Sequence, residues 1–141
     1  MKRLLSSFLL AGLLAANAQA QAPAPACPGP DDVRPEQLLG TWKAQMQGEW
    51  SESTVTLVRH PEYAGSFRGT LERATGRWLV AGDYTDGVFT MEESADGQHI
   101  AAAWLGEMVD GSCGREIRGT WTRDGETTGR GFTLRKQAPK P

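Results

Sequence analysis

The sequence predicts an all-β protein: an antiparallel, up-and-down, eight-stranded barrel with a short N-terminal helical turn. Eight segments alternate apolar and polar residues with the period of two that a half-buried strand requires. No helical period lies between them, so consecutive strands should pair, and closure into a barrel removes both sheet edges. Asp-Gly pairs favour tight hairpin turns, and they occur at Asp86-Gly87, Asp96-Gly97, Asp110-Gly111 and Asp124-Gly125.

The expected strands cover residues 38–46, 54–59, 66–73, 77–84, 88–93, 99–109, 116–123 and 131–135. Ile100 is placed on the inward face, and glycines 69, 106 and 119 are expected to make room for indole rings. Proline suits the first position of a helix, so a helical turn over residues 35–38 is expected to plug one end. The inward face is predicted to hold its largest side chains at Trp42, Phe67, Trp78, Phe89, Trp104, Trp121 and Phe132.

The first twenty residues have the features of a secretory signal peptide. Lys2 and Arg3 precede an apolar run, and Ala18-Gln19-Ala20 forms an A-x-A cleavage site. The run is shorter than the roughly 20 residues of a spanning helix, so we expect cleavage after Ala20 and no membrane anchor. The prediction is a periplasmic or secreted protein with a Pro/Ala-rich tether and helical turn over 21–37, a barrel domain over 38–136 and a tail over 137–141.

Charge and cysteine content narrow the classes of partner. The chain has 15 Lys and Arg against 17 Asp and Glu, a formal net charge of −2, and this lacks the basic footprint of a nucleic-acid-binding protein. Cys27 and Cys113 are an even pair in an exported chain, which predicts a disulfide. The alternative is two free thiols or metal ligands, but two cysteines without a nearby histidine make a poor metal site. No metal or cofactor is expected.

Several segments carry a family resemblance. Leu39-Gly40-Thr41-Trp42 has the Gly-x-Trp pattern that opens the first strand of the calycins, the superfamily of eight-stranded barrels that includes lipocalins and avidins. Residues 65–72, 77–84 and 131–136 are similar to the third, fourth and last strands of streptavidin-like proteins, which carry tryptophans where Trp104 and Trp121 stand. The resemblance implies the barrel fold and leaves a homo-oligomer open. It does not imply biotin binding, because the family's polar biotin contacts are replaced here by Ala44, Leu71, Arg73, Ile100 and Ala102.

The inward aromatic residues allow two interpretations. They line a pocket for a small, mostly apolar ligand, or they fill the interior, which in an eight-stranded barrel is just wide enough for side chains. Trp50 lies outside the strand pattern and either caps a ligand or contacts a partner at the barrel mouth, or serves as a lid. The candidate ligand contacts are Trp42, Trp78, Trp104, Trp121, Phe67 and Phe89, with Trp50 at the rim.

No catalytic constellation is recognisable. His60 and His99 stand at strand ends without a Ser or Cys partner in a known spacing, and Gly-x-Ser-x-Gly is absent. The acidic residues Glu92, Glu93 and Asp96 are interpreted as solvated turn charges. We therefore predict a non-catalytic exported protein that binds a small apolar ligand. The alternative is an interaction protein that inhibits or neutralises an exported hydrolase through loops 47–52, 61–65 and 110–115, and a packed interior would favour it.

Overall fold

The structure is a computed structural model that describes residues 22–23 and 26–141. The predicted signal peptide lies outside the described residues. Two 3-10 turns, η1 (Pro30–Asp32) and η2 (Pro35–Leu38), precede the strands, and η2 confirms the predicted helical turn. The strands are β1 (Gly40–Met46), β2 (Ser53–Arg59), β3 (Ser66–Arg73), β4 (Gly76–Thr85), β5 (Val88–Ser94), β6 (Ala102–Met108), β7 (Glu116–Arg123) and β8 (Arg130–Lys136).

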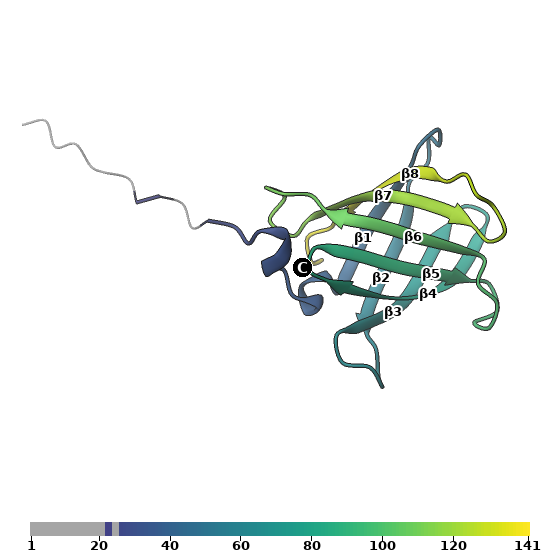
Figure 1. Cartoon of the computed structure of the whole chain (residues 1–141), viewed down its shortest axis with the longest axis horizontal. Helices are drawn as coiled ribbons and strands as arrows, with labels where there is room; N and C mark the ends of the chain where they lie inside the picture. The colour runs from purple at the N-terminus through teal and green to yellow at the C-terminus, as the bar shows by residue number, and fades with distance from the viewer. Residues whose placement is uncertain (1–21, 24–25) are drawn as a thin grey trace, which may run out of the picture.

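The eight strands form one closed antiparallel barrel in chain order, which confirms the predicted fold class (Figure 1). Closure comes from pairing of β1 with β8, where Trp42 lies opposite Lys136 and Met46 opposite Phe132. Every strand therefore has a neighbour on both sides, and no edge is left to recruit another chain. No helix in the described part of the chain is long and apolar enough to cross a membrane.

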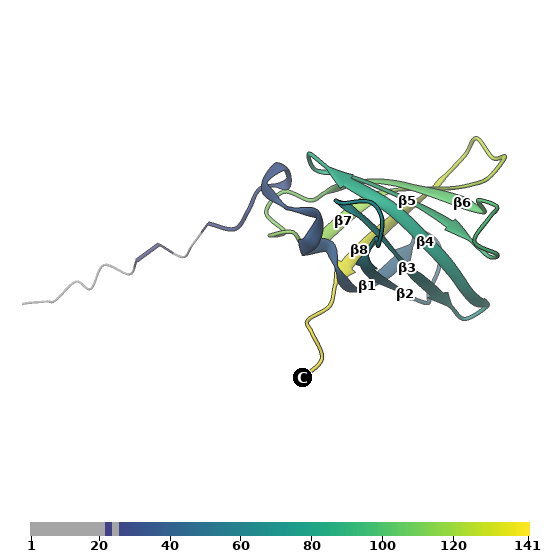
Figure 2. The same cartoon turned by 90° about the horizontal axis from the view of Figure 1, so that it is seen from below.

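The barrel has two unlike ends because antiparallel strands alternate in direction. We call the end that carries η1, η2 and loops 60–65, 86–87 and 109–115 the plugged end. The other end carries loops 47–52, 74–75, 95–101 and 124–129, and we call it the open end. Figure 2 shows the N-terminal segment and its 3-10 turns gathered at the plugged end, where β8 also finishes.

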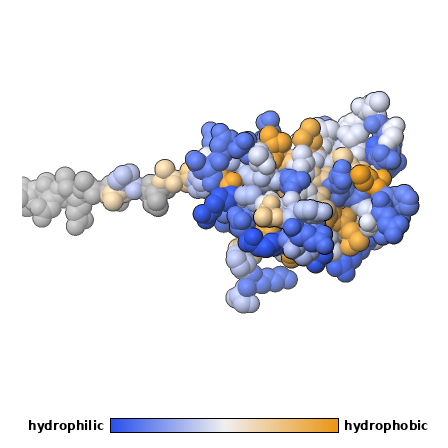
Figure 3. Space-filling view, turned by 60° about the horizontal axis from the view of Figure 1, so that its bottom comes forward, coloured by the Kyte–Doolittle hydropathy of each residue, from blue (hydrophilic) through white to orange (hydrophobic). Residues whose placement is uncertain are grey.

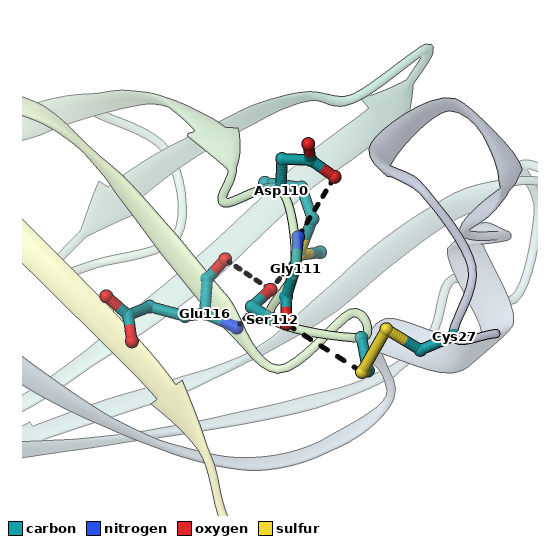
Figure 4. The surroundings of a disulfide bond; sticks show 7 residues. Cys27, Asp110, Gly111, Ser112 and Glu116 are labelled. Atoms are coloured by element: carbon teal, nitrogen blue, oxygen red, sulfur yellow. Dashed lines mark hydrogen bonds between the residues drawn. A yellow bond between two sulfur atoms is a disulfide. The ribbon is translucent and has the colours of Figure 1, made fainter. Parts of the chain in front are cut away.

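Side chains and a disulfide hold η1 and η2, which we call the plug, in place. Trp42 Nε1 donates a hydrogen bond to the Leu38 carbonyl at 2.7 Å, and Tyr84 Oη donates to the Pro30 carbonyl at 2.7 Å. Cys27 and Cys113 form the predicted disulfide, which joins the segment before η1 to loop 109–115 (Figure 4). The bond spans 86 residues of sequence and should stabilise the fold by about 4 kcal/mol in the chain-entropy model.

Glycines in the wall make room for phenylalanine rings. A Cβ on Gly82 would lie 2.8 Å from Phe67 Cζ, and one on Gly106 would lie 2.9 Å from Phe132 Cζ. The predicted inward position of Gly106 is confirmed. Gly82 also faces inward, which was not predicted. The expectation that Gly69, Gly106 and Gly119 make room for indoles is wrong. The ring beside Gly106 belongs to Phe132, and a Cβ on Gly69 or Gly119 would first meet the backbone of Thr56 or Leu105.

The sixth strand starts later than predicted. Residues 99–101 belong to the loop before β6, and Ile100, which was predicted to face inward, is 46 % exposed. The reason is local: Asp96 Oδ1 accepts hydrogen bonds from the backbone N–H groups of Gln98 and His99, both at 2.8 Å. These bonds hold the backbone in a turn where alternation alone suggested an extended chain.

Candidate functional site

A buried carboxylate lies at the open end of the barrel. Glu93 on β5 is only 3 % exposed, and Arg73 on β3 binds it through two hydrogen bonds of 3.0 and 2.8 Å. Trp104 Nε1 and Trp121 Nε1 donate to the same carboxylate at 2.8 and 3.3 Å. A buried charge needs this degree of pairing, because an uncompensated one is too costly to keep inside a protein.

Cationic side chains surround the aromatic rings at this end. The Arg73 guanidinium lies 4.7 Å from the centre of the Trp78 ring and 6.0 Å from that of Trp121. Arg130 and Arg123 approach Trp121 at 4.9 and 5.9 Å. These distances are in the range of cation–π attraction, so the arginines and indoles form one packed cluster. We call Arg73, Glu93, Trp78, Trp104 and Trp121 the mouth cluster.

The mouth cluster corrects one prediction and adds polar contacts that were not predicted. Glu93 was interpreted as a solvated turn charge, but its side chain is buried. The indole N–H groups of Trp104 and Trp121 donate hydrogen bonds to it, and that of Trp42 donates to a backbone carbonyl. The sequence does hold a signal for this: Glu93 continues the inward alternation of Phe89 and Met91 and therefore faces the interior.

Most predicted ligand contacts are fully enclosed. The exposed fraction is 1 % or less for Trp42, Phe67, Phe89 and Trp104. Phe67 stacks on Phe89 with ring centres 5.5 Å apart, and Trp104 meets Phe132 edge-on at 4.8 Å. Side chains packed in this way present no surface to a ligand, so the interior in this conformation is a core.

The structure brings only some of the predicted residues together. Trp78, Trp104 and Trp121 meet in the mouth cluster, whereas Trp42 contacts the plug and the Phe67–Phe89 pair belongs to strand ends on the plugged side. Trp78 is only partly buried, and Trp121 is 7 % exposed. A molecule that approaches the open end therefore meets Trp78 before any other inward indole.

Trp50 is the most exposed large hydrophobic residue of the described chain, at 103 %. Its loop, 47–52, is nevertheless tied to the start of β8: Gln47 N donates to the Gly131 carbonyl at 2.8 Å, and Arg130 pairs with Glu49 at 2.9 Å. Trp50 therefore does not cover the barrel end as a lid. It stands in water on a loop with a defined conformation.

The other two candidate loops, 61–65 and 110–115, lie at the plugged end, so the three loops do not form one surface. Loop 61–65 and the outer wall of β3 to β5 border a hollow of about 310 Å³ that includes His60, Ser66 and Asp83. His60 Nδ1 accepts hydrogen bonds from two backbone N–H groups, and Ser66 donates directly to Asp83. The three side chains are therefore not arranged as a Ser–His–Asp relay.

Neither metal-ligand geometry nor similarity to a known protein assigns a function to this site. The residues that the structure describes contain no group of three or more His, Cys, Asp or Glu side chains placed to hold a metal ion. No protein-family model matches the chain, and no curated protein matches it in sequence. The site must therefore be interpreted from its own geometry.

Proposed function

We propose that this chain is an exported, non-catalytic binding module with a calycin-like barrel, and that it binds a partner protein at its open end. The observation that carries the proposal is Trp50, which is fully exposed on a loop that β8 holds in place. Tryptophan is enriched among residues that dominate binding energy at protein interfaces. A loop that is ordered before binding loses little conformational entropy when a partner arrives.

The filled interior supports a surface function. The 3-10 turns cover the plugged end, the mouth cluster fills the interior at the open end, and the core side chains between them are in contact. An apolar ligand inside would have to displace some of these side chains, which would break a well-packed core. The barrel then serves as a rigid scaffold that positions its loops.

The surroundings of Trp50 suit a protein partner. The loops beside it carry ion pairs, Arg130–Glu49 and Arg123–Glu126, on the rim of the open end. An aromatic anchor with a polar, solvated rim is the usual composition of a protein–protein interface. The signal-like N-terminus and the disulfide support export, so the proposed partner is another exported protein. We propose that this partner is a hydrolase and that the barrel inhibits it.

The test uses two immobilised variants beside the wild type. Trp50→Ala removes the proposed anchor, and Tyr63→Ala removes another exposed aromatic residue at the opposite end of the barrel. From an extract of exported proteins, the wild type and Tyr63→Ala should retain the same stoichiometric partner. Trp50→Ala should weaken its binding about 30-fold, as expected for a central tryptophan.

Two outcomes contradict the proposal: recovery of no stoichiometric partner, and equal retention by Trp50→Ala. The purified partner is then assayed for hydrolase activity with and without the barrel. A partner whose hydrolysis is unaffected would remove the inhibitory role and leave the docking site in place.

Binding of a small, mostly apolar ligand is the second candidate, and one observation favours it. Trp78 is only partly buried and lies at the open end, where a ligand could reach its ring without entering the core. Titration of apolar probes against tryptophan fluorescence tests this idea. It requires a saturable response that Trp78→Ala abolishes.

A further inference from the structure

A second candidate site lies on the outside of the barrel. The outer wall of β1 and β2 and the segment after β8 border a groove of about 1210 Å³, which we call the tail groove. Gln137 N donates to the Thr41 carbonyl at 2.8 Å, which continues the pairing of β8 with β1 and sets the course of this segment. Figure 2 shows the C-terminal segment leaving the barrel beside the start of β1. No residue of loop 47–52 lines the groove.

Positive charge from distant parts of the sequence converges on the tail groove. Its lining includes Lys43, Arg115, Lys136 and Lys140, with Glu72 as the acidic residue. The three lysines are all the lysines of the described chain, and they come from β1, the end of β8 and the tail. This concentration contrasts with the net charge of −2 for the whole chain, so the groove has a local field opposite in sign to the average.

These cations lack carboxylate partners. Among the described residues, the ion pairs within 4.0 Å involve seven arginines and His99, and none of them includes a groove cation. Lys43 Nζ instead donates to Thr54 Oγ1 at 2.9 Å, and Lys136 Nζ donates to the Gln37 carbonyl. Both acceptors are neutral, so the charges of the two ammonium groups remain uncompensated.

Lys43 and Lys136 are also partly withdrawn from water. Burial lowers the pKa of the Lys136 ammonium, and the positive charge of Arg115 lowers it further. Partly buried cations that repel one another are stabilised by an anion between them. The free groove therefore holds a charge arrangement that a bound anion would improve.

The remaining lining indicates the kind of anion. Thr41, Thr54 and Thr56 contribute hydroxyl groups from the outer face of β1 and β2. Lysine binds phosphate as a point charge, and hydroxyl groups can bond both phosphate oxygens and ligand hydroxyls. The groove, at about 1210 Å³, is also far larger than one phosphate ion and somewhat larger than the roughly 300–1,000 Å³ of most small-molecule sites, so it has room for a molecule with several phosphate groups.

We propose that the tail groove binds an organic polyphosphate, a molecule that carries several phosphate groups on a hydroxylated skeleton. This site and the protein-docking site at the open end are independent, because they share no residue. Loss of one in an experiment leaves the other unaffected.

Calorimetric titration of the full chain with inositol hexakisphosphate tests the proposal. The wild type should bind with an affinity that falls as salt is added. Lys43→Gln and Lys136→Gln should each weaken binding at least about tenfold, since each removes a charged contact. Lys43→Arg keeps the charge and should retain most of the affinity. Arg68→Gln removes one exposed charge outside the groove and should leave binding unchanged.

Two further titrations identify the source of the phosphate. Inorganic phosphate should bind far more weakly than the hexakisphosphate, because it fills a small part of the groove. Vesicles of phosphatidylcholine with phosphatidic acid should not compete with the soluble probe. Binding to vesicles alone would overturn the proposal in favour of a membrane surface. The proposal would also be overturned if the wild type did not bind the hexakisphosphate, or if Arg68→Gln and Lys43→Gln weakened its binding equally.

Discussion

At the scale of single residues, the main feature is that one carboxylate organises the open end. Glu93 accepts hydrogen bonds from one arginine and two tryptophans, and the arginine in turn lies against Trp78. Removal of one partner from such a cluster costs more stability than the intact cluster contributes, because the partner left behind stays buried and unpaired.

Arg73→Met tests this sensitivity. We expect it to lower the free energy of unfolding by about 3–5 kcal/mol, because the Glu93 carboxylate loses its cation while it stays buried. Denaturant unfolding of the variant and the wild type provides the measurement. Arg77→Met is the matched control: Arg77 pairs with Glu72 at 3.9 Å, both side chains are exposed, and the change should stay within about 0.5 kcal/mol.

A second variant separates lost charge pairing from lost packing. Glu93→Gln combined with Arg73→Met removes both charges and leaves an amide oxygen to accept from the two indoles. The double variant should therefore be more stable than Arg73→Met alone. If Arg73→Met cost no more than Arg77→Met, the ion pair would not be buried in the way described.

At the scale of elements, turns decide where strands begin. The positive φ values of Gly87, Gly97, Gly111 and Gly125 confirm that all four Asp-Gly pairs mark chain reversals. The pair at Asp96 does more than reverse the chain, because its carboxylate also binds Ser94 and the His99 ring at 3.0 and 2.6 Å. These hydrogen bonds keep the backbone after Asp96 in a turn, so β6 begins only at Ala102.

The His99 ring reports on that turn through its titration. Its hydrogen bond to Asp96 and the charge of that carboxylate raise the pKa of His99 above 6.5. A pKa raised by folding means that the protonated ring favours the folded turn at acid pH. This contribution is lost as the pH rises through the folded-state pKa, and exposure keeps it small.

NMR titration of the imidazole signals should place the His99 pKa above 6.5 in the wild type. Asp96→Asn should return the pKa toward 6.5, whereas Asp124→Asn, which alters another Asp-Gly turn, should leave it unchanged. An unshifted pKa in the wild type would show that the Asp96–His99 contact does not persist in solution.

At the scale of the whole molecule, side chains fill the barrel: η1 and η2 cover the plugged end, and the mouth cluster fills the interior at the open end. Figure 3 shows apolar surface broken into separate areas among polar ones, and the exposed large apolar residues include Leu79, Leu105 and Trp50. The largest inward rings are instead buried, and their burial stabilises the fold.

Phe89→Ala tests whether the interior is filled. Truncation of a fully buried phenylalanine should cost about 3–5 kcal/mol and leave a dry cavity beside Phe67. Saturating benzene should raise the melting temperature of Phe89→Ala and leave that of the wild type unchanged. Val88→Ala, at a neighbouring exposed position, is the control. A wild type that benzene stabilises equally would have a hollow interior.

The sequence by itself determined the number and order of the strands, most of their inward faces, the helical turn over residues 35–38 and the disulfide pair. Alternation and turn chemistry are local properties of the backbone, so Trp42, Phe67 and Asp86-Gly87 could be placed without knowledge of any partner. Only the tertiary structure decided which side chains Glu93 pairs with, that Trp50 stands in water, and that three lysines meet in one groove. These features depend on which strands close against each other and in which register, and neither is written in the pattern of a single segment.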